Sequence, residues 1–307
     1  MALPLIDLAA ASEDELARRI DGALREQGFF AVAGHGVAHG VVQAAFDAGH
    51  RFFALSEADK RRWHIDGWPV KRGFDPIGWQ SLDPGQPPDV KESFYLGVEA
   101  IGPNQWPDET LLPGFRAAME TYSAAMEALA RRLMRLFEIA LGVPRGGFES
   151  FMRHPTCTTR LLHYPPQPSA ALPGQIGCGA HTDWGALTLL AQDDAGGLQV
   201  QRSGSGRDGG RDSGWTDVEP QAGTLVVNVG DMAQRWTNDR WRSTVHRVIN
   251  RQAGRDRWSI AYFFDLDAEA VITPLPQCTS ENNPPRYGPI TSGQHLADMY
   301  RRTTVAA

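Results

Sequence analysis

Apolar residues recur at helical spacing along the first half of the chain. A run at three- and four-residue intervals follows Ser12, with a glutamate three positions after it in the spacing of a capping box, and predicts a helix that stops at Gly28. Two further helices are predicted over 41–53 and 115–141. The second is the strongest helical signal, because its apolar positions keep close to the 3.6-residue period until Gly142, which a proline soon follows.

Beyond residue 155 the pattern changes to short strands separated by Gly, Pro and Asp. Strands are predicted over 159–164, 186–191, 198–201, 215–218, 225–229 and 258–264, with two earlier ones at 3–8, on a sheet edge, and 29–32. The stretch 63–106 is irregular, and 202–214 has the composition of a hairpin tip. Helices followed by many short strands predict a mainly β protein, with a helical N-terminal layer on a double-sheet jelly roll.

Composition narrows the class of protein. The chain has 307 residues and a formal charge of −6 without a long Lys/Arg stripe, which argues against nucleic acid as a partner. It contains neither a secretory signal nor an apolar run of about 18 residues, so no membrane partner is expected. Cys157, Cys178 and Cys278 form no C-x-x-C pair, which disfavours a cysteine zinc site and fits a reducing compartment. We expect a cytoplasmic enzyme with a small-molecule substrate, its oligomeric state open.

The first chemical signal is the tripeptide His181-Thr182-Asp183. Residues i and i+2 of an extended chain point to the same side, so its imidazole and carboxylate converge on one point. His246, much further along, supplies a second imidazole. Two histidines and one carboxylate make the facial triad of non-haem Fe(II) oxygenases, which leaves metal positions open. The tripeptide by itself is a weak pattern, since a lone histidine is more often an ordinary core or surface residue.

A second signal follows His246. Arg257 and Ser259 share one face of a predicted strand that continues into an apolar run. A guanidinium pairs with a carboxylate through two parallel hydrogen bonds, and a hydroxyl adds a third, so the pair suits the distal carboxylate of 2-oxoglutarate. The alternative is an arginine on an edge strand that pairs with a surface acid. The preceding histidines and aspartate favour the co-substrate site.

The ordered motifs of the chain resemble the isopenicillin N synthase-like family of 2-oxoglutarate/Fe(II)-dependent oxygenases. The matching segments are 71–74, 89–94, 161–166, 179–185, 196–200, 228–231, 235–238, 243–248 and 257–259. The resemblance covers nearly the whole chain. It implies a double-stranded β-helix of the cupin-like, jelly-roll type, in which His181, Asp183 and His246 are the catalytic iron ligands.

The same resemblance implies how the co-substrate binds. It makes Arg257 and Ser259 the clamp on 2-oxoglutarate, and Tyr164 matches a family tyrosine that also reaches this co-substrate. Many plant members carry an asparagine two positions before that tyrosine, where this chain has Leu162. Phe263 shares the strand face of the clamp, so it is either a substrate-side wall or a plain core residue.

The implied activity couples decarboxylation of 2-oxoglutarate to hydroxylation or desaturation of an unidentified small organic substrate, with Fe(II) and O2. Three alternatives stay open. The chain could be an oxidase of the same fold that does not use 2-oxoglutarate. It could be a zinc or manganese barrel protein without redox chemistry, since the triad also suits zinc. It could also be a non-catalytic binding module, against which the intact triad argues.

We expect one oxygenase domain over 1–307. Its parts are a mixed helical portion (1–150), a jelly-roll core with the metal and 2-oxoglutarate site (155–270) and a C-terminal extension (271–307). The stretch 63–106 and a C-terminal helix near 295–300 are expected to shape the substrate pocket. Candidate pocket residues are Lys71, Arg72, Lys91 and Trp79, and the tryptophans at 63, 68, 79 and 106 either line the pocket or pin the loop to the core.

Overall fold

The protein is described here by a computed structural model that covers residues 3–67, 71–83, 85–167, 171–202, 214–250 and 254–303. Trp68 and most of the expected hairpin tip, 203–213, therefore lie outside the described residues. Within these ranges, no helix is both long and apolar enough to cross a lipid bilayer. The three cysteines are buried and form no disulfide.

Two facing β-sheets form the centre of the fold. The large sheet has the strand order β1 (Leu5–Asp7), β2 (Phe29–Ala33), β10 (Leu225–Val229), β7 (Leu187–Gln192), β12 (Arg257–Phe264), β5 (Thr158–Tyr164), β4 (Glu92–Gly97) and β3 (Gly73–Asp75). The small sheet has the order β6 (Cys178–His181), β11 (His246–Val248), β8 (Leu198–Gln201) and β9 (Trp215–Asp217). A further pair joins β13 (Val271–Ile272) and β14 (Ile290–Thr291). This is the predicted jelly roll.

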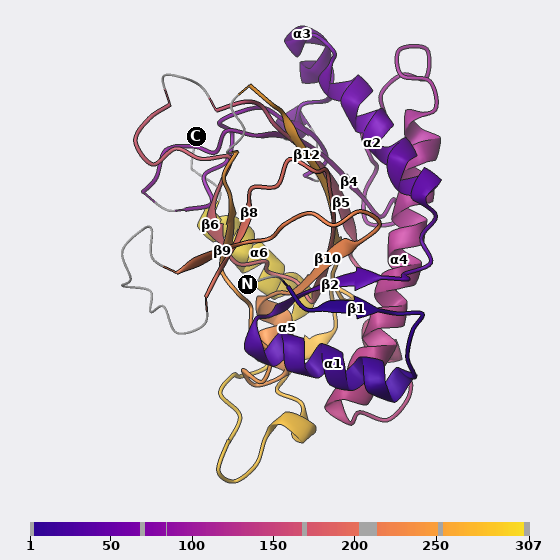
Figure 1. The fold of residues 1–307 in the computed structure, drawn as a ribbon, viewed down its shortest axis with the longest axis vertical. Helices are drawn as coiled ribbons and strands as arrows, with labels where there is room; N and C mark the ends of the chain where they lie inside the picture. The colour runs from indigo at the N-terminus through magenta and orange to yellow at the C-terminus, as the bar shows by residue number, and fades with distance from the viewer. Residues whose placement is uncertain are drawn as a thin grey trace.

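Long helices of the N-terminal half cover the outer face of the large sheet. The α-helices are α1 (Glu13–Glu26), α2 (His39–Phe53), α3 (Glu57–Lys60), α4 (Phe115–Leu141), α5 (Asp231–Trp236) and α6 (Ser292–Thr303). Short 3-10 helices span Arg61–Trp63, Ile65–Gly67, Glu149–Phe151 and Pro276–Cys278. Figure 1 shows the long α4 beside the large sheet, on the side away from β6, β8 and β9. The predicted helical layer is therefore confirmed.

One face of the large sheet packs against the helices, and the other lines the space between the two sheets. Along β12 the outward residues Ile260, Tyr262 and Phe264 belong to the apolar core shared with the helices. The inward residues Arg257 and Ser259 face the space between the sheets. β12 lies between β5 and β7, whose inward residues face the same space. The outward face of β12 is therefore apolar, whereas its inward face carries the polar side chains of Arg257 and Ser259.

Most predicted elements are confirmed. The helix of 115–141 has the predicted bounds, and the hydroxyl of Ser12 caps α1 by accepting from the backbone N–H of Glu15. The prediction of an irregular stretch over 63–106 was wrong for two short segments, which form β3 and β4 of the large sheet. Polar Glu92 and Ser93 begin β4 and hide its strand character, yet both are buried. The short strands β6 and β11 were also missed.

Candidate metal centre and adjoining cavities

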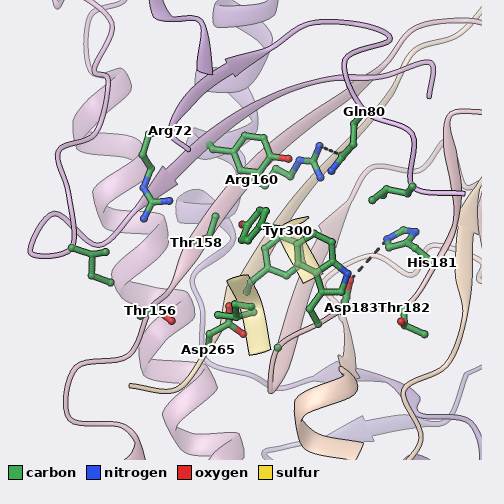
Figure 2. Close-up of a pocket in the computed structure, with 17 residues that line it drawn as sticks. Arg72, Gln80, Thr156, Thr158, Arg160, His181, Thr182, Asp183, Asp265 and Tyr300 are labelled. Atoms are coloured by element: carbon green, nitrogen blue, oxygen red, sulfur yellow. Dashed lines mark hydrogen bonds and ion pairs between the residues drawn. The ribbon is translucent and has the colours of Figure 1, made fainter. Parts of the chain in front are cut away.

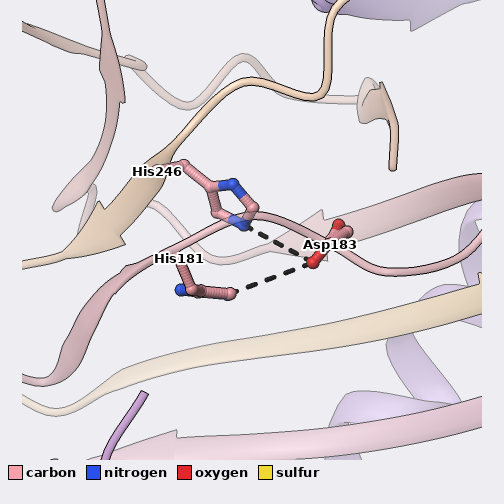
Figure 3. Close-up of side chains that lie close together, drawn as sticks. All are labelled: His181, Asp183 and His246. Atoms are coloured by element: carbon pink, nitrogen blue, oxygen red, sulfur yellow. Dashed lines mark ion pairs between the residues drawn. The ribbon is translucent and has the colours of Figure 1, made fainter. Parts of the chain in front are cut away.

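Antiparallel pairing of two short strands brings the histidines together. His181 ends β6 and His246 begins β11, and the two residues lie directly opposite each other in the ladder. Their ring centroids are 4.3 Å apart. Asp183 follows β6 by two residues, and Figure 3 shows its carboxylate facing both imidazoles from one side. One potential ligand atom from each of the three side chains lies within 4.8 Å of the others.

The two oxygens of the Asp183 carboxylate have different surroundings. Oδ2 accepts hydrogen bonds from Thr188 Oγ1 and Asn228 Nδ2, each at 2.6 Å. Oδ1 faces Nε2 of His181 at 4.0 Å and Nε2 of His246 at 3.6 Å. Burial by itself would raise the pKa of Asp183, but the two histidines and the two hydrogen bonds lower it below its usual value. The buried carboxylate is therefore held ionised.

Backbone carbonyls hold both imidazoles in one tautomer. Nδ1 of His181 donates to the carbonyl of Gly179 at 2.8 Å, and Nδ1 of His246 donates to the carbonyl of Thr244 at 3.1 Å. Each ring therefore presents an unprotonated Nε2 toward Asp183, the arrangement that metal-binding histidines require. Burial lowers the pKa of both histidines, that of His246 to about 4 with His181 beside it as the second cause. Both rings are neutral at pH 7.

This donor set fits a divalent transition metal. Two ligands that each lie about 2.1 Å from one ion are roughly 3 to 4 Å apart, which agrees with the separations between Asp183 Oδ1 and the two Nε2 atoms. Two neutral imidazoles and one carboxylate are the ligands of the facial triad. The structure thus brings together the three residues that the sequence predicted as metal ligands.

Arg257 lies in the same enclosed space without a carboxylate partner. Its guanidinium donates to the carbonyl of Gly196 at 2.7 Å, to Ser259 Oγ at 3.1 Å and to Gln192 Oε1 at 3.2 Å. No ion pair joins this side chain to an acid in the described ranges, although it is 1% exposed. The ring of Tyr164 packs 4.8 Å from the guanidinium carbon. A buried cation with only neutral partners requires an anion from outside the chain.

The predicted co-substrate residues and the triad line one small cavity of about 60 Å³. Its walls include Arg257, Ser259, Tyr164, Leu162, His181, Asp183, His246 and Phe263. The bond between Arg257 and Ser259, and the packing of Tyr164 on Arg257, show that these three residues form one cluster. Burial raises the pKa of Tyr164, so its hydroxyl stays protonated and can donate to an anion.

A second cavity of about 210 Å³ adjoins the triad from the other side. It is lined by Arg72, Gln80, Leu82, Tyr95, Ile101, Thr156, Thr158, Arg160, His181, Thr182, Asp183, Trp184, Gly185, Phe263, Asp265, Leu296 and Tyr300. Figure 2 shows His181 and Asp183 at one end and Arg72 at the other. Phe263 lines both cavities. Segments 63–106 and α6 therefore contribute walls to this cavity.

Of the four residues that the sequence suggested for the pocket, one lines the larger cavity. This residue is Arg72. Lys71 is exposed and pairs with Asp66, whereas Lys91 is buried against Asp89. The exposed Trp79 contacts a histidine ring edge-on and is absent from the lining residues.

The remaining tryptophans do not form an aromatic pocket within the described residues. Trp63 is buried in the main core, and Trp106 packs against it. These two side chains therefore pin the loop to the core.

Sequence reasoning missed the residues that support the triad. Thr188 and Asn228 lie opposite each other on β7 and β10 and both bind Asp183. Asn228 lies in segment 228–231, which matches the family pattern, but the match did not indicate what this residue does. The available signal was a polar residue inside an otherwise apolar strand, which marks a position where a side chain needs a polar partner.

Two family models match the chain. The model of the 2OG-Fe(II) oxygenase superfamily matches residues 155–266. The model described as "non-haem dioxygenase in morphine synthesis N-terminal" matches residues 3–109. Together they cover more than half of the chain.

Curated relatives match over nearly the full length. A 2-oxoglutarate-Fe(II) type oxidoreductase of Emericella nidulans is 33% identical, over 98% of this chain and 90% of the relative. A 2-oxoglutarate-dependent dioxygenase of Monascus ruber is 37% identical, over 89% of this chain and 87% of the relative.

Solved structures agree with these matches. A full-length Neurospora crassa protein, solved in complex with alpha-KG, is 32% identical, with a TM-score of 0.86 over 98% of this chain and 96% of that protein. A putative 2OG-Fe(II) oxygenase family protein of Caulobacter crescentus is 28% identical, with a TM-score of 0.84 over 98% of each chain.

Proposed function

Because this chain belongs to the 2OG-Fe(II) oxygenase superfamily and is a 2-oxoglutarate-dependent Fe(II) oxygenase, we propose that it hydroxylates or desaturates a small organic substrate bound in the 210 Å³ cavity. One observation carries the proposal. His181 and Asp183 line both cavities, so the triad stands where the co-substrate space with Arg257 meets the substrate space with Trp184.

The proposed iron ligands are His181, Asp183 and His246. Bound iron and 2-oxoglutarate supply the oxidation of substrate by O2, with 2-oxoglutarate decarboxylated to succinate and CO2. The protein's own contribution is positioning. Thr188 and Asn228 hold Asp183 Oδ2, which keeps Oδ1 directed at the metal position.

We propose that Arg257, Ser259 and Tyr164 bind the distal carboxylate of 2-oxoglutarate. Arg257 supplies the fork of N–H donors, and Ser259 Oγ lies 3.1 Å from Nη1, close enough to share the same anion. Gln192 and Gly196 fix the guanidinium from the other side. Phe263, which lines both cavities, is the proposed wall between co-substrate and substrate.

The partner is a small molecule. The Neurospora crassa protein, which is similar to this chain, has also been solved with thymine and with 5-formyluracil. A cavity of about 210 Å³ is below the roughly 300–1,000 Å³ that is common for drug-sized ligands. The charge of −6 supports an enzyme that does not bind nucleic acid, and we propose a cytoplasmic location away from membranes.

The chain is proposed to act as one oxygenase domain over 1–307. Residues 1–150 supply the outer helical layer, 155–270 carry the metal and 2-oxoglutarate site, and 271–307 cover the substrate cavity. Lining residues Leu296 and Tyr300, both on α6, support the role of the C-terminal part. The relatives named as 2-oxoglutarate-dependent dioxygenases favour this activity over the same-fold oxidase, the zinc or manganese barrel protein and the binding module.

The test begins with anaerobic Fe(II) protein. Titration with 2-oxoglutarate is expected to produce an absorption band, and admission of O2 is expected to release succinate and CO2. His246→Ala should abolish both signals, because it removes one of three ligands. His154→Ala, which changes an exposed histidine, is the matched control. Absence of the 2-oxoglutarate-dependent band in the unmodified protein would refute the proposal.

A further inference from the structure

Arg72 is a cation that lines the substrate cavity without an acid to pair with. No carboxylate in the described ranges lies within 4.0 Å of its guanidinium nitrogens, and its buried Nε has no hydrogen-bond partner. Among the described residues its guanidinium makes one hydrogen bond, from Nη1 to the carbonyl of Lys71, which is long at 3.3 Å. Tyr300 and, after it, Glu99 raise the pKa of Arg72 against burial, and the Glu99 carboxylate already accepts hydrogen bonds from Asn104 and Trp106. Burial lowers the pKa of Arg72, which reflects a desolvated charge without close compensation.

The end of strand β4 leaves room for this guanidinium. Arg72 precedes β3, and its guanidinium packs on the Cα of Gly97 at the end of β4, where an added Cβ would overlap Nη2 and Cζ. The φ of Gly97 is not in the left-handed region, so the backbone does not require glycine here. The missing side chain instead leaves room for the guanidinium. Figure 2 shows Arg72 directed into the cavity from the end opposite His181.

Three arginines line the two cavities, and their partners differ. Arg160 is paired with Asp75 at 3.2 Å and also donates to Gln80 and Ser93, so its charge is compensated within the protein. Arg257 and Arg72 have no acid partner among the described residues. The co-substrate carboxylate is the proposed anion for Arg257. Arg72 is only half-buried, but its Nε is buried without a partner, so a second anion would stabilise this guanidinium by the same kind of electrostatic attraction.

We propose that Arg72 binds a carboxylate of the primary substrate, so that this oxygenase acts on a small organic acid. The substrate then spans the cavity, with its anionic end at Arg72 and the oxidised carbon near His181 and Asp183. This inference rests on the function proposed above and names its substrate class.

The rest of the cavity supports a monocarboxylate with an apolar body. Tyr95, Trp184 and Tyr300 supply aromatic walls, and Ile101 and Leu296 supply aliphatic ones. A phosphate monoester carries about −1.5 to −2 charges at pH 7, more than a single free guanidinium balances, whereas a carboxylate carries one.

Asp265, which lines the cavity together with Asp183, repels a bound anion only weakly. Burial raises the pKa of Asp265 to about 7, and the charge of Asp183 adds to this rise. A hydrogen bond from the backbone N–H of Ala186 acts in the opposite direction. The carboxyl of Asp265 is therefore protonated in a large fraction of molecules at neutral pH.

The test uses the anaerobic Fe(II) protein saturated with 2-oxoglutarate, so that added acids cannot occupy the Arg257 site. The probes are benzoate, phenylacetate, 3-phenylpropionate and octanoate, each compared with its primary amide. Binding is measured by the change in the 2-oxoglutarate-dependent absorption band and by ligand-observed NMR. At least one acid is expected to bind, and its amide should bind about tenfold to a hundredfold more weakly, because a charge-assisted contact is lost.

Two variants address the residue itself. Arg72→Gln should weaken binding of the acid about tenfold to a hundredfold and leave that of the amide unchanged. Gly97→Ala should also weaken the acid, because its Cβ displaces the guanidinium while the charge is kept. Arg61→Gln, at an exposed arginine of similar chemistry that pairs with Glu57, is the matched control. Both variants should keep the affinity for 2-oxoglutarate, which shows that they are folded.

The opposing outcomes are distinct. Failure of every acid to bind, equal binding of acid and amide, or unchanged acid affinity in Arg72→Gln or Gly97→Ala would each overturn the carboxylate assignment. Failure of the proposed function itself appears earlier in the same experiment. In that case no absorption band forms when 2-oxoglutarate alone is added to the unmodified Fe(II) protein.

Discussion

Asp265 directly follows β12, and its carboxyl accepts a hydrogen bond from the backbone N–H of Ala186 but is not fully hydrogen-bonded. Its Oδ1 is buried without a hydrogen-bond partner and packs on Gly185, where an added Cβ would overlap it. Burial raises the pKa of this carboxyl from 3.8 to about 7, and the nearby charge of Asp183 adds to the effect. We therefore expect Asp265→Asn, which keeps the shape and removes the ionisation, to change how stability depends on pH.

The magnitude follows from the two pKa values of Asp265. A carboxyl with a raised pKa in the folded state binds more protons folded than unfolded, so it costs stability as pH rises above its unfolded pKa. The cost is absent well below pH 3.8 and complete above the folded pKa of about 7. A shift of this size corresponds to about 4 kcal/mol at roughly 1.36 kcal/mol per pH unit, of which about 2 to 3 kcal/mol develops between roughly pH 5 and pH 8.

The assay is urea unfolding of metal-free protein at about pH 5 and about pH 8, for the unmodified chain and for Asp265→Asn. The stability of the variant relative to the unmodified chain should rise by about 2 to 3 kcal/mol between these pH values. Asp267→Asn removes a charge from the same loop and is the matched control. A difference that stays constant with pH, or that falls as pH rises, would refute the reasoning about Asp265.

Two further substitutions test individual hydrogen bonds. Asn228→Leu removes the donor to Asp183 Oδ2, and we expect Fe(II) affinity to fall about 10- to 100-fold in an anaerobic competition with a chelator; unchanged affinity would contradict the supporting role. Glu138→Ala leaves the backbone N–H groups of Gly146 and Phe148 without their buried acceptor and should lower the free energy of unfolding by about 3 kcal/mol or more, measured in urea; a loss below about 1 kcal/mol would show that water replaces the carboxylate.

Local signals were sufficient for the long helices α1, α2 and α4 and for most of the strands of the jelly-roll core. The bounds of α4 follow from an uninterrupted apolar period and from Gly142, which takes a left-handed conformation (φ 68°) that glycine adopts without strain. The hydroxyl of Ser12 caps α1 as its sequence spacing predicts. Two of the three proposed metal ligands were also predictable, because a short extended segment fixes the relation of His181 to Asp183.

Elements that depend on distant partners could not be predicted in this way. β4 begins with Glu92 and Ser93, which look like solvent-facing residues. Glu92 is buried because Lys60, 32 positions earlier, pairs with it at 2.6 Å, and Ser93 is buried because it bonds Asp75 and Arg160. Nothing within the strand itself indicates these partners. For the same reason β6 and β11, which have only a few residues each, are defined by their pairing and not by their own sequences.

The inner face of the large sheet suggests a more general signal in such strands. Thr188, Gln192 and Asn228 interrupt apolar strands, and each binds either Asp183 or Arg257. A polar side chain at such a position costs stability unless it is hydrogen-bonded, so its retention there implies a partner in the cavity. The same reasoning separates an arginine with an acid partner from one without. A guanidinium that faces a cavity with only neutral neighbours is a binding group that still needs its ligand.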